Sequence, residues 1–313
     1  MPSLKDLRDR IKSVKSTRQI TKTMKMVAAA KMRKAEGACE NARPYAVALD
    51  DVLQNLAAQT PEGSAPVILK GRKNVQTVRL IVFGSNRGLC GGFNVQIARA
   101  ATKAVADYQR QGKNVQLVTV GSKMFSALKT EFNEHIVHRD DAAATEQTYG
   151  HAEELGQLAI NGFTEGVCDE VHILYNSFVN VMTQKPTFKQ LIPFKSNELA
   201  EETLGDDDAQ LNASQPTSQA IGQPNKVMKS TPEYEPDEEQ ILATLLPLNV
   251  NTQIFAALLE SGAAEQGARM AAMDSATRNA GDMISSLSLN YNRQRQANIT
   301  SELTEIVAGA ESV

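Results

Sequence analysis

Apolar side chains near the start of the chain follow one another in alternating steps of three and four residues. The spacing begins with Leu4, Leu7, Ile11 and Val14 and continues more weakly through Thr21, Ala28, Met32 and Ala35. Such steps are typical of a coiled-coil seam. Ser3 precedes the pattern and Asp6 follows three residues later, which favours a capped helix start. The sequence therefore predicts a helix over residues 3–58, within a coiled-coil segment 1–60, with a kink at Pro44.

The last part of the chain, residues 237–313, repeats this spacing. The stripe contains Met270, Met273, Thr277, Ala280, Ile284, Leu287 and Tyr291, and after a slip it resumes with Ile299, Leu303, Ile306 and Ala310. Acidic residues 237–239 suit the start of a helix, and Pro247 is expected to kink it. Two long amphipathic helices cannot bury their stripes alone, so each is expected to cover the other. The sequence predicts a long antiparallel coiled coil.

Residues 75–195 have a different pattern, in which apolar runs alternate with helical periodicity. Strands are expected at Val78–Phe83, Val115–Val120 and Val171–Phe178, with an edge strand at Thr187–Phe194 between two prolines. Helices are expected over residues 94–111, 122–131 and 146–162. This alternation indicates βαβ units and a mainly parallel sheet. The fold class is therefore α/β, with the long antiparallel coiled coil standing on a Rossmann-like domain.

Charge is distributed unevenly, although the whole chain has a formal net charge of only −3. Residues 1–36 carry 11 Lys or Arg against three Asp or Glu, and residues 197–240 carry 11 acids against two lysines. Residues 196–236 lack an apolar period, so we expect a polar insertion or surface loop there. The basic helix is interleaved with a seam and no nucleic-acid-binding motif accompanies it, which argues against nucleic acid as a partner.

The chain has three cysteines, Cys39, Cys90 and Cys168, which are far apart and odd in number. This excludes a disulfide framework, shows no metal-ligand spacing and favours a reducing compartment. We expect neither a membrane-spanning helix nor a signal peptide, because no long uninterrupted apolar run is seen.

A glycine-rich segment, residues 84–94 with the sequence GSNRGLCGGFN, lies between a predicted strand and a predicted helix. That position suits phosphate binding at a helix N-terminus, but the spacing matches neither the dinucleotide nor the P-loop pattern. One alternative is nevertheless a nucleotide-binding Rossmann-like enzyme that uses Gly88 to Gly92, and a nucleophilic Cys90 stays open beside it. A third alternative is a passive coiled-coil scaffold.

Three segments together resemble the γ subunits of F-type ATP synthases, of the bacterial type. They are residues 20–29 (ITKTMKMVAA), residues 87–94 (RGLCGGFN) and residues 291–310 (YNRQRQANITSELTEIVAGA). The resemblance covers the chain except for about residues 197–232. It implies a non-catalytic rotor shaft, one copy per complex, that couples rotation of a membrane c-ring to conformational cycling of catalytic sites.

The resemblance also implies partners and contact positions. The partners would be an α3β3 hexamer, an ε subunit and the c-ring, with a small inhibitory subunit left open. Mg-ATP and ADP would bind to α and β, with no cofactor or metal on this chain, and the complex would lie peripherally on the cytoplasmic face of the inner membrane. Rotor–stator contacts are expected at Met24, Lys25, Arg87, Cys90, Arg295, Gln296, Thr300 and Glu302. Tyr234 and Glu235 would contact ε and the c-ring, and Ile306 to Val313 would enter an apolar collar.

Overall fold

The computed structural model describes residues 3–59, 66–72, 74–194 and 238–311. Two helices dominate it: α1 spans Leu4–Gln59 and α6 spans Glu238–Glu311. Ser3 and Asp6 cap α1 reciprocally, because the Asp6 N–H donates to Ser3 Oγ at 3.1 Å and the Ser3 N–H donates to Asp6 Oδ2 at 3.0 Å. Pro44 and Pro247 both lie inside a continuous helix.

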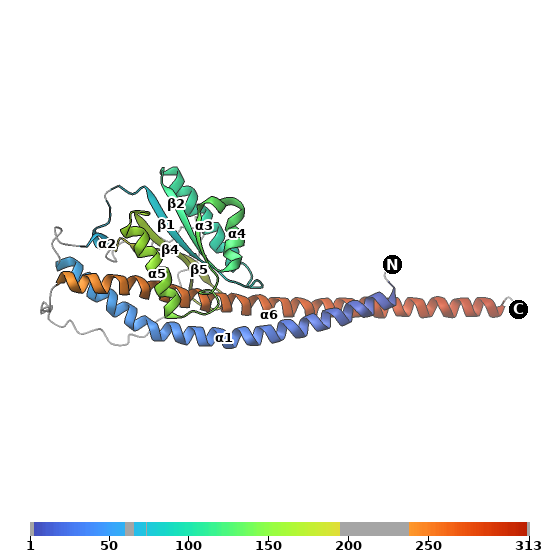
Figure 1. Cartoon of the computed structure of the whole chain (residues 1–313). Helices are drawn as coiled ribbons and strands as arrows, with labels where there is room; N and C mark the ends of the chain where they lie inside the picture. The colour runs from blue at the N-terminus through green and yellow to red at the C-terminus, as the bar shows by residue number, and fades with distance from the viewer. Residues whose placement is uncertain (1–2, 60–65, 73, 195–237, 312–313) are drawn as a thin grey trace, which may run out of the picture.

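The two helices lie side by side and run in opposite directions, as the sequence predicted (Figure 1). The predicted seam is buried at Leu7, Thr21, Ala28 and Met32 on α1 and at Met273 and Ala280 on α6. Thr21, Ala28 and Ala280 have small side chains, which let two helices approach closely. Beyond the start of α1, however, α6 continues alone, and its last stripe is open: Ile299 is 48%, Leu303 57% and Ile306 67% exposed. Within the described part of the chain, no other helix covers those residues.

A five-stranded sheet lies beside the helices, in the order β3-β2-β1-β4-β5. Its strands are β1 Thr77–Phe83, β2 Asn114–Val120, β3 Ile136–Asp140, β4 Glu170–Phe178 and β5 Gln184–Ile192. The first four strands pair in parallel, and β5 pairs with β4 antiparallel. The connecting helices are α2 Val67–Lys70, α3 Phe93–Arg110, α4 Ser122–Phe132 and α5 Tyr149–Thr164.

Two of the sequence predictions for this domain were wrong. Strand β3 was missed, because it is short and its middle residues, Val137 to Arg139, are exposed at the sheet edge and carry no apolar alternation. The edge strand was placed at Thr187–Phe194, whereas β5 begins at Gln184 and contains Pro186. A proline is tolerated there because an edge strand leaves one side without ladder partners.

The paired helices α1 and α6 are called the shaft below, and α6 contributes to the core of the α/β domain. On one face of the sheet, α3 and α4 cover Leu80, Val82 and Leu117. On the other face, α5 and the first half of α6 pack against Ile81, Phe83 and neighbouring strand residues. The α6 side chains in this cluster are Val250, Ile254, Ala257 and Leu258. The α/β domain therefore does not merely carry the coiled coil, since α6 is one of its covering helices.

The sequence analysis expected no helix that could span a membrane, and the packing of α6 bears on this expectation. Within Ile241–Thr304, α6 has a stretch that is apolar enough to cross a membrane by length and composition, with a mean hydropathy of 1.5. Such stretches also occur in helices that pack inside proteins. Here Ile254 and Leu258 cover the sheet, and Leu242 and Leu246 pack against Leu53 of α1. Internal packing therefore accounts for part of the apolar character of this stretch, 44% of which is buried.

Candidate functional site: the glycine-rich loop and the helical shaft

The glycine-rich loop, residues 84–92, joins β1 to α3 and lies where the carboxyl ends of β1 and β2 meet. Close approach explains two glycines there. A Cβ on Gly84 would lie 2.7 Å from Met124 Cβ, and one on Gly121 would lie 2.9 Å from the Ser85 carbonyl oxygen. Gly121 also has a φ of 100°, which side chains rarely allow. These glycines serve the packing of two strand ends.

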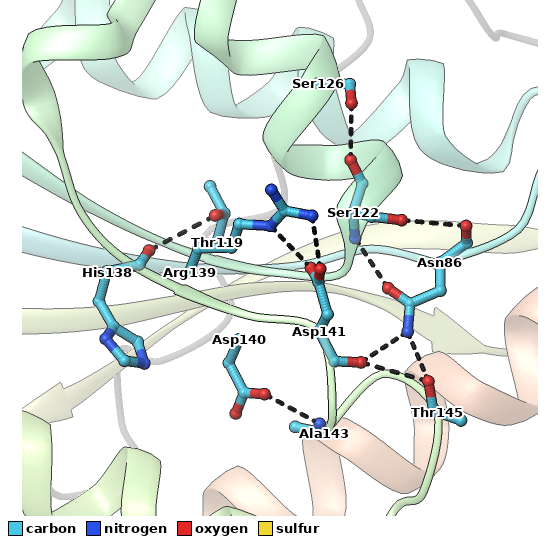
Figure 2. A network of polar contacts seen from close by, with 10 residues as sticks. All are labelled: Asn86, Thr119, Ser122, Ser126, His138, Arg139, Asp140, Asp141, Ala143 and Thr145. Atoms are coloured by element: carbon cyan, nitrogen blue, oxygen red, sulfur yellow. Dashed lines mark hydrogen bonds and ion pairs between the residues drawn. The ribbon is translucent and has the colours of Figure 1, made fainter.

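Asn86 ties this loop to the loops that follow β2 and β3 (Figure 2). Its Oδ1 accepts the Ser122 N–H at 2.8 Å, and its Nδ2 donates to the Asp141 carbonyl oxygen and to Thr145 Oγ1, both at 2.6 Å. At the other side of the loop, Asn94 Oδ1 accepts the Ser85 N–H at 3.1 Å. The loop is therefore held by side-chain amides on both sides.

Some backbone donors near the loop are already used within the chain, and at the start of α3 the Phe93 N–H donates to the Cys90 carbonyl oxygen at 3.3 Å. At the start of α4, the Ser122 N–H bonds Asn86 and the Lys123 N–H bonds the Ser85 carbonyl oxygen. A pocket between Phe83, Gln147 and Glu265 has a volume of about 10 Å³, which is too small for a nucleotide, and none of Gly88 to Gly92 lines it. The geometry therefore does not support the alternative of a nucleotide-binding enzyme.

Cys90 faces α6, while its neighbours face outward. Its side chain is 2% exposed and packs with Phe93 against Ala264 and Ala268 of α6. Burial raises the pKa of the Cys90 thiol, which opposes a nucleophilic role. Arg87 is exposed, and Leu89 is 64% exposed. Of the two loop residues expected to contact a stator, Arg87 presents its side chain outward and Cys90 does not.

A cavity beside α1 and α6 contains a second cysteine, whose thiol is not activated as a nucleophile. A cavity of about 260 Å³ opens between α1, β5 and α6, lined by Cys39, Arg43, Lys189 and Glu260 among others. Burial is the largest cause that raises the pKa of Cys39 to about 11, so its thiol is neutral at neutral pH. Among the described residues, no group of three His, Cys, Asp or Glu side chains could hold a metal ion.

Further along the shaft, the residues around Met24 form a polar junction between the helices. Met24 is half-buried, and Lys25 Nζ lies 2.6 Å from Asp274 Oδ1 on α6. The hydrogen bond from Lys25 is the largest cause that lowers the pKa of Asp274. Lys25 was expected to contact a stator, yet here its ammonium group bridges the two helices of the shaft.

The four C-terminal positions expected to contact a stator lie at the end of the paired region of α6 or beyond it. Arg295, Gln296, Thr300 and Glu302 are exposed. The Thr300 hydroxyl donates to the Gln296 carbonyl oxygen at 2.9 Å, so it is satisfied within the helix. Just before these positions, Arg8 Nη2 donates to Tyr291 Oη at 2.8 Å across the helices. Tyr234 and Glu235 lie outside the described residues.

The sequence patterns did not point to three residues that organise the loop and the shaft: Asn86, Glu265 and Arg269. Arg269 Nη2 lies 2.6 Å from Glu265 Oε1, and each of the two side chains is only 10% exposed. A signal existed, because two opposite charges four residues apart interrupt an Ala-rich helical face. Asn86 carried no comparable signal, since its partners come from loops that only the fold brings together.

Comparisons with known proteins agree with this architecture. A family model described as ATP synthase matches residues 3–313. The chain is 47% identical over 316 residues to the ATP synthase gamma chain of Ruegeria sp. (strain TM1040), and 45% identical over 315 residues to that of Brucella ovis, with both chains fully covered in each case.

Two solved structures share the fold at lower identity. One is in the mitochondrial ATP synthase of Euglena gracilis, with a TM-score of 0.63 at 16% identity over 99% of this chain and 94% of that chain. Another is in the central stalk and c-ring of the Tetrahymena thermophila enzyme, with a TM-score of 0.57 at 22% identity over 82% of this chain and 99% of that chain. A coiled-coil shaft with a lateral α/β domain is thus the shared class of structure. The chain belongs to the ATP synthase gamma-chain family.

Proposed function

We propose that this chain is the central rotor shaft of a proton-translocating F-type ATP synthase and has no catalytic site of its own. One observation carries the proposal: α6 spans 74 residues, and its last part projects beyond α1 with Ile299, Leu303 and Ile306 open. An amphipathic helix that exposes such a stripe needs a partner to cover it. A ring of stator subunits around the shaft would supply that cover.

In this proposal, rotation of a membrane c-ring turns the shaft, and each face of the shaft biases one catalytic site of an α3β3 hexamer. Nucleotide and Mg²⁺ bind to those partner subunits. The α/β domain, with an ε subunit, lies toward the c-ring at the cytoplasmic face of the bacterial inner membrane. Met24, Arg87, Arg295, Gln296, Thr300 and Glu302 supply the exposed or half-exposed stator contacts. Lys25 contributes less directly, because Asp274 already holds it.

Copurification and coupled activity test this function. Affinity-tagged chain is expected to bring down α, β and ε subunits in a complex that hydrolyses ATP, while the isolated chain binds no nucleotide. In inverted membrane vesicles that lack the chain, adding it back should restore ATP-driven acidification. Nucleotide binding by the isolated chain would favour the enzyme instead. ATP hydrolysis and acidification that do not depend on the chain would favour a passive scaffold.

A further inference from the structure

Arg269 connects the shaft to the glycine-rich loop. Its Nη2 lies 3.3 Å from the carbonyl oxygens of both Arg87 and Gly88, and 2.6 Å from Glu265 Oε1. The two hydrogens on this nitrogen suffice for the carboxylate and for a three-centre bond to the two carbonyls. Glu265 thus orients a guanidinium that reaches across from α6 to the loop.

A buried ion pair is a costly way to make such a contact. Each of the two side chains is 10% exposed, and an apolar pair of similar volume is often equally stable or more stable. Burial is the largest influence on the pKa of Glu265 and raises it, while Arg269, Lys31 and Arg87 lower it. A pair of this kind is best explained by the position it imposes on its neighbours.

The loop itself is held in a conformation that it would not adopt freely. Leu89 has a φ of 63° and Gly91 has a φ of 58°, and the left-handed region is unfavourable for a residue with a side chain such as Leu. Such backbone persists only where surrounding contacts determine it. Those contacts are Asn86 on the sheet side, and Arg269 with the Cys90 packing on the α6 side.

We propose that Glu265 and Arg269 are positioning residues that hold the glycine-rich loop closed on α6, so that the loop adds a polar link to the apolar packing between the α/β domain and the shaft and contributes to the transmission of torque between them. The path runs from the loops after β2 and β3, through Asn86, along Arg87 and Gly88, to Arg269. The glycine-rich loop lies between a strand and a helix, as phosphate-binding loops do. Here it links the α/β domain to α6 through hydrogen bonds. The torque part of this inference rests on the proposed function, whereas the closed loop does not.

Cys90 reports whether the loop is closed, because its thiol is 2% exposed and is covered by α6. The test is the rate at which N-ethylmaleimide labels Cys90 in the full-length chain, followed by peptide mass spectrometry. Cys168 is an internal control, since it is 0% exposed and belongs to the cluster between the sheet and α5. The principal variant is Glu265→Gln/Arg269→Met, which removes both buried charges together and so leaves neither unpaired. Arg110→Gln on α3, with a side chain 75% exposed, is the matched control.

The double variant is expected to label at Cys90 about tenfold faster or more, because a hydrogen bond from a charged group contributes at least about 1.4 kcal/mol, a factor of ten. Cys168 should label at the rate of the unmodified chain in both variants. Unchanged labelling of Cys90 would overturn the closed loop. Equal acceleration at both cysteines would also overturn it, because the pair would then stabilise the whole domain. Glu265→Gln alone should give an intermediate rate at Cys90 if the carboxylate orients the guanidinium.

Vesicles then test the transmission of torque separately. With the double variant, ATP-driven acidification per ATP hydrolysed is expected to fall about twofold or more, while Arg110→Gln keeps the unmodified ratio; a loss of this size corresponds to a modest coupling free energy. Faster labelling with an unchanged ratio would overturn the torque path and keep the closed loop. If the unmodified chain supports no acidification at all, the proposed function fails, and the labelling result still stands.

Discussion

The hydroxyl oxygens of Thr21 on α1 and Thr277 on α6 lie 2.8 Å apart across the helix interface. One turn away, Lys25 pairs with Asp274 of α6. The flanking seam consists of small or flexible residues such as Ala28, Met273 and Ala280, which fit in more than one register. Polar contacts are directional, so the threonine pair and the ion pair select one register for an otherwise permissive seam.

A disulfide should replace the threonine pair. Because these short side chains already place their oxygens 2.8 Å apart, Thr21→Cys/Thr277→Cys is expected to oxidise readily to a bridge of ordinary geometry. The complex should still hydrolyse ATP, since the two helices turn as one unit. Gel mobility after mild oxidation gives the yield. Thr17→Cys/Thr277→Cys, one turn away at an exposed position of α1, is the control. Equal yields in the two variants would contradict this register.

Met24→Lys is expected to impair coupling more than catalysis. Met24 is half-buried beside the Lys25–Asp274 pair, so a lysine there must extend its ammonium outward from the shaft. If it meets an acidic stator group, the new pair contributes about 0.2–1 kcal/mol at an exposed site and resists each step of rotation. Assembly and most ATP hydrolysis should persist while acidification per ATP falls. Met24→Leu serves as control. An unchanged ratio with the lysine would remove Met24 from the contacts.

Changes at Arg295 or Gln296 should lower both activities together. Both side chains are exposed near the end of the paired region of α6, so their loss removes contacts with partners and leaves the fold of this chain intact. Replacing either residue by Leu is expected to reduce hydrolysis and acidification in parallel, about tenfold if one charge-assisted contact is lost. Asn292→Leu, exposed on the same helix, is the control. Full activity in the Arg295 and Gln296 variants would argue against these contacts.

Arg269→Met alone should make stability depend strongly on pH. Without Arg269, burial raises the pKa of Glu265 further above its ordinary value. A carboxyl whose folded-state pKa is raised gives stability that is complete below the unfolded pKa and is lost as pH rises through the folded pKa. The free energy of unfolding of the variant should therefore be about 3–5 kcal/mol lower near neutral pH. Part of this loss should be regained as the pH falls. Urea unfolding at several pH values measures this, and Glu265→Gln/Arg269→Met should abolish the dependence. A variant with the pH profile of the unmodified chain would contradict it.

Deleting residues 203–228 should leave assembly and ATP hydrolysis nearly unchanged. The segment is polar, contains Pro216 and Pro224, and has no periodic apolar face that would bury a core. It lies outside the described residues, so the sequence alone carries this prediction. Native electrophoresis and the ATPase rate of the purified complex measure the outcome. Replacing the segment by a Gly-Ser linker of equal length is the control for spacing. A deletion that prevents assembly while the linker restores it would show that length matters.

Local pattern was sufficient where one periodicity extends over many residues. The steps of three and four in α1 and α6 predicted both helices and their antiparallel pairing, and alternating apolar runs predicted β1, β2 and β4 nearly to the residue. Three short motifs, one in each helix and one in the glycine-rich loop, were also sufficient to indicate the family. Where the pattern was short or polar, as in β3, the same reasoning failed.

Three features depended on tertiary structure alone. The covering of the sheet by α6 joins residues more than 80 positions apart, such as Ile173 and Ile254, and helical periodicity cannot say which partner a buried face meets. The role of Asn86 depends on three loops that the parallel sheet brings to one edge. The burial of Cys90 and the pairing of Lys25 with Asp274 follow from close neighbours on α6. A sequence determines which faces are apolar and where helices begin, because these are properties of neighbouring residues. Which polar side chain meets which is decided by the fold, because a hydrogen bond or an ion pair depends on distances of a few ångströms between distant parts of the chain.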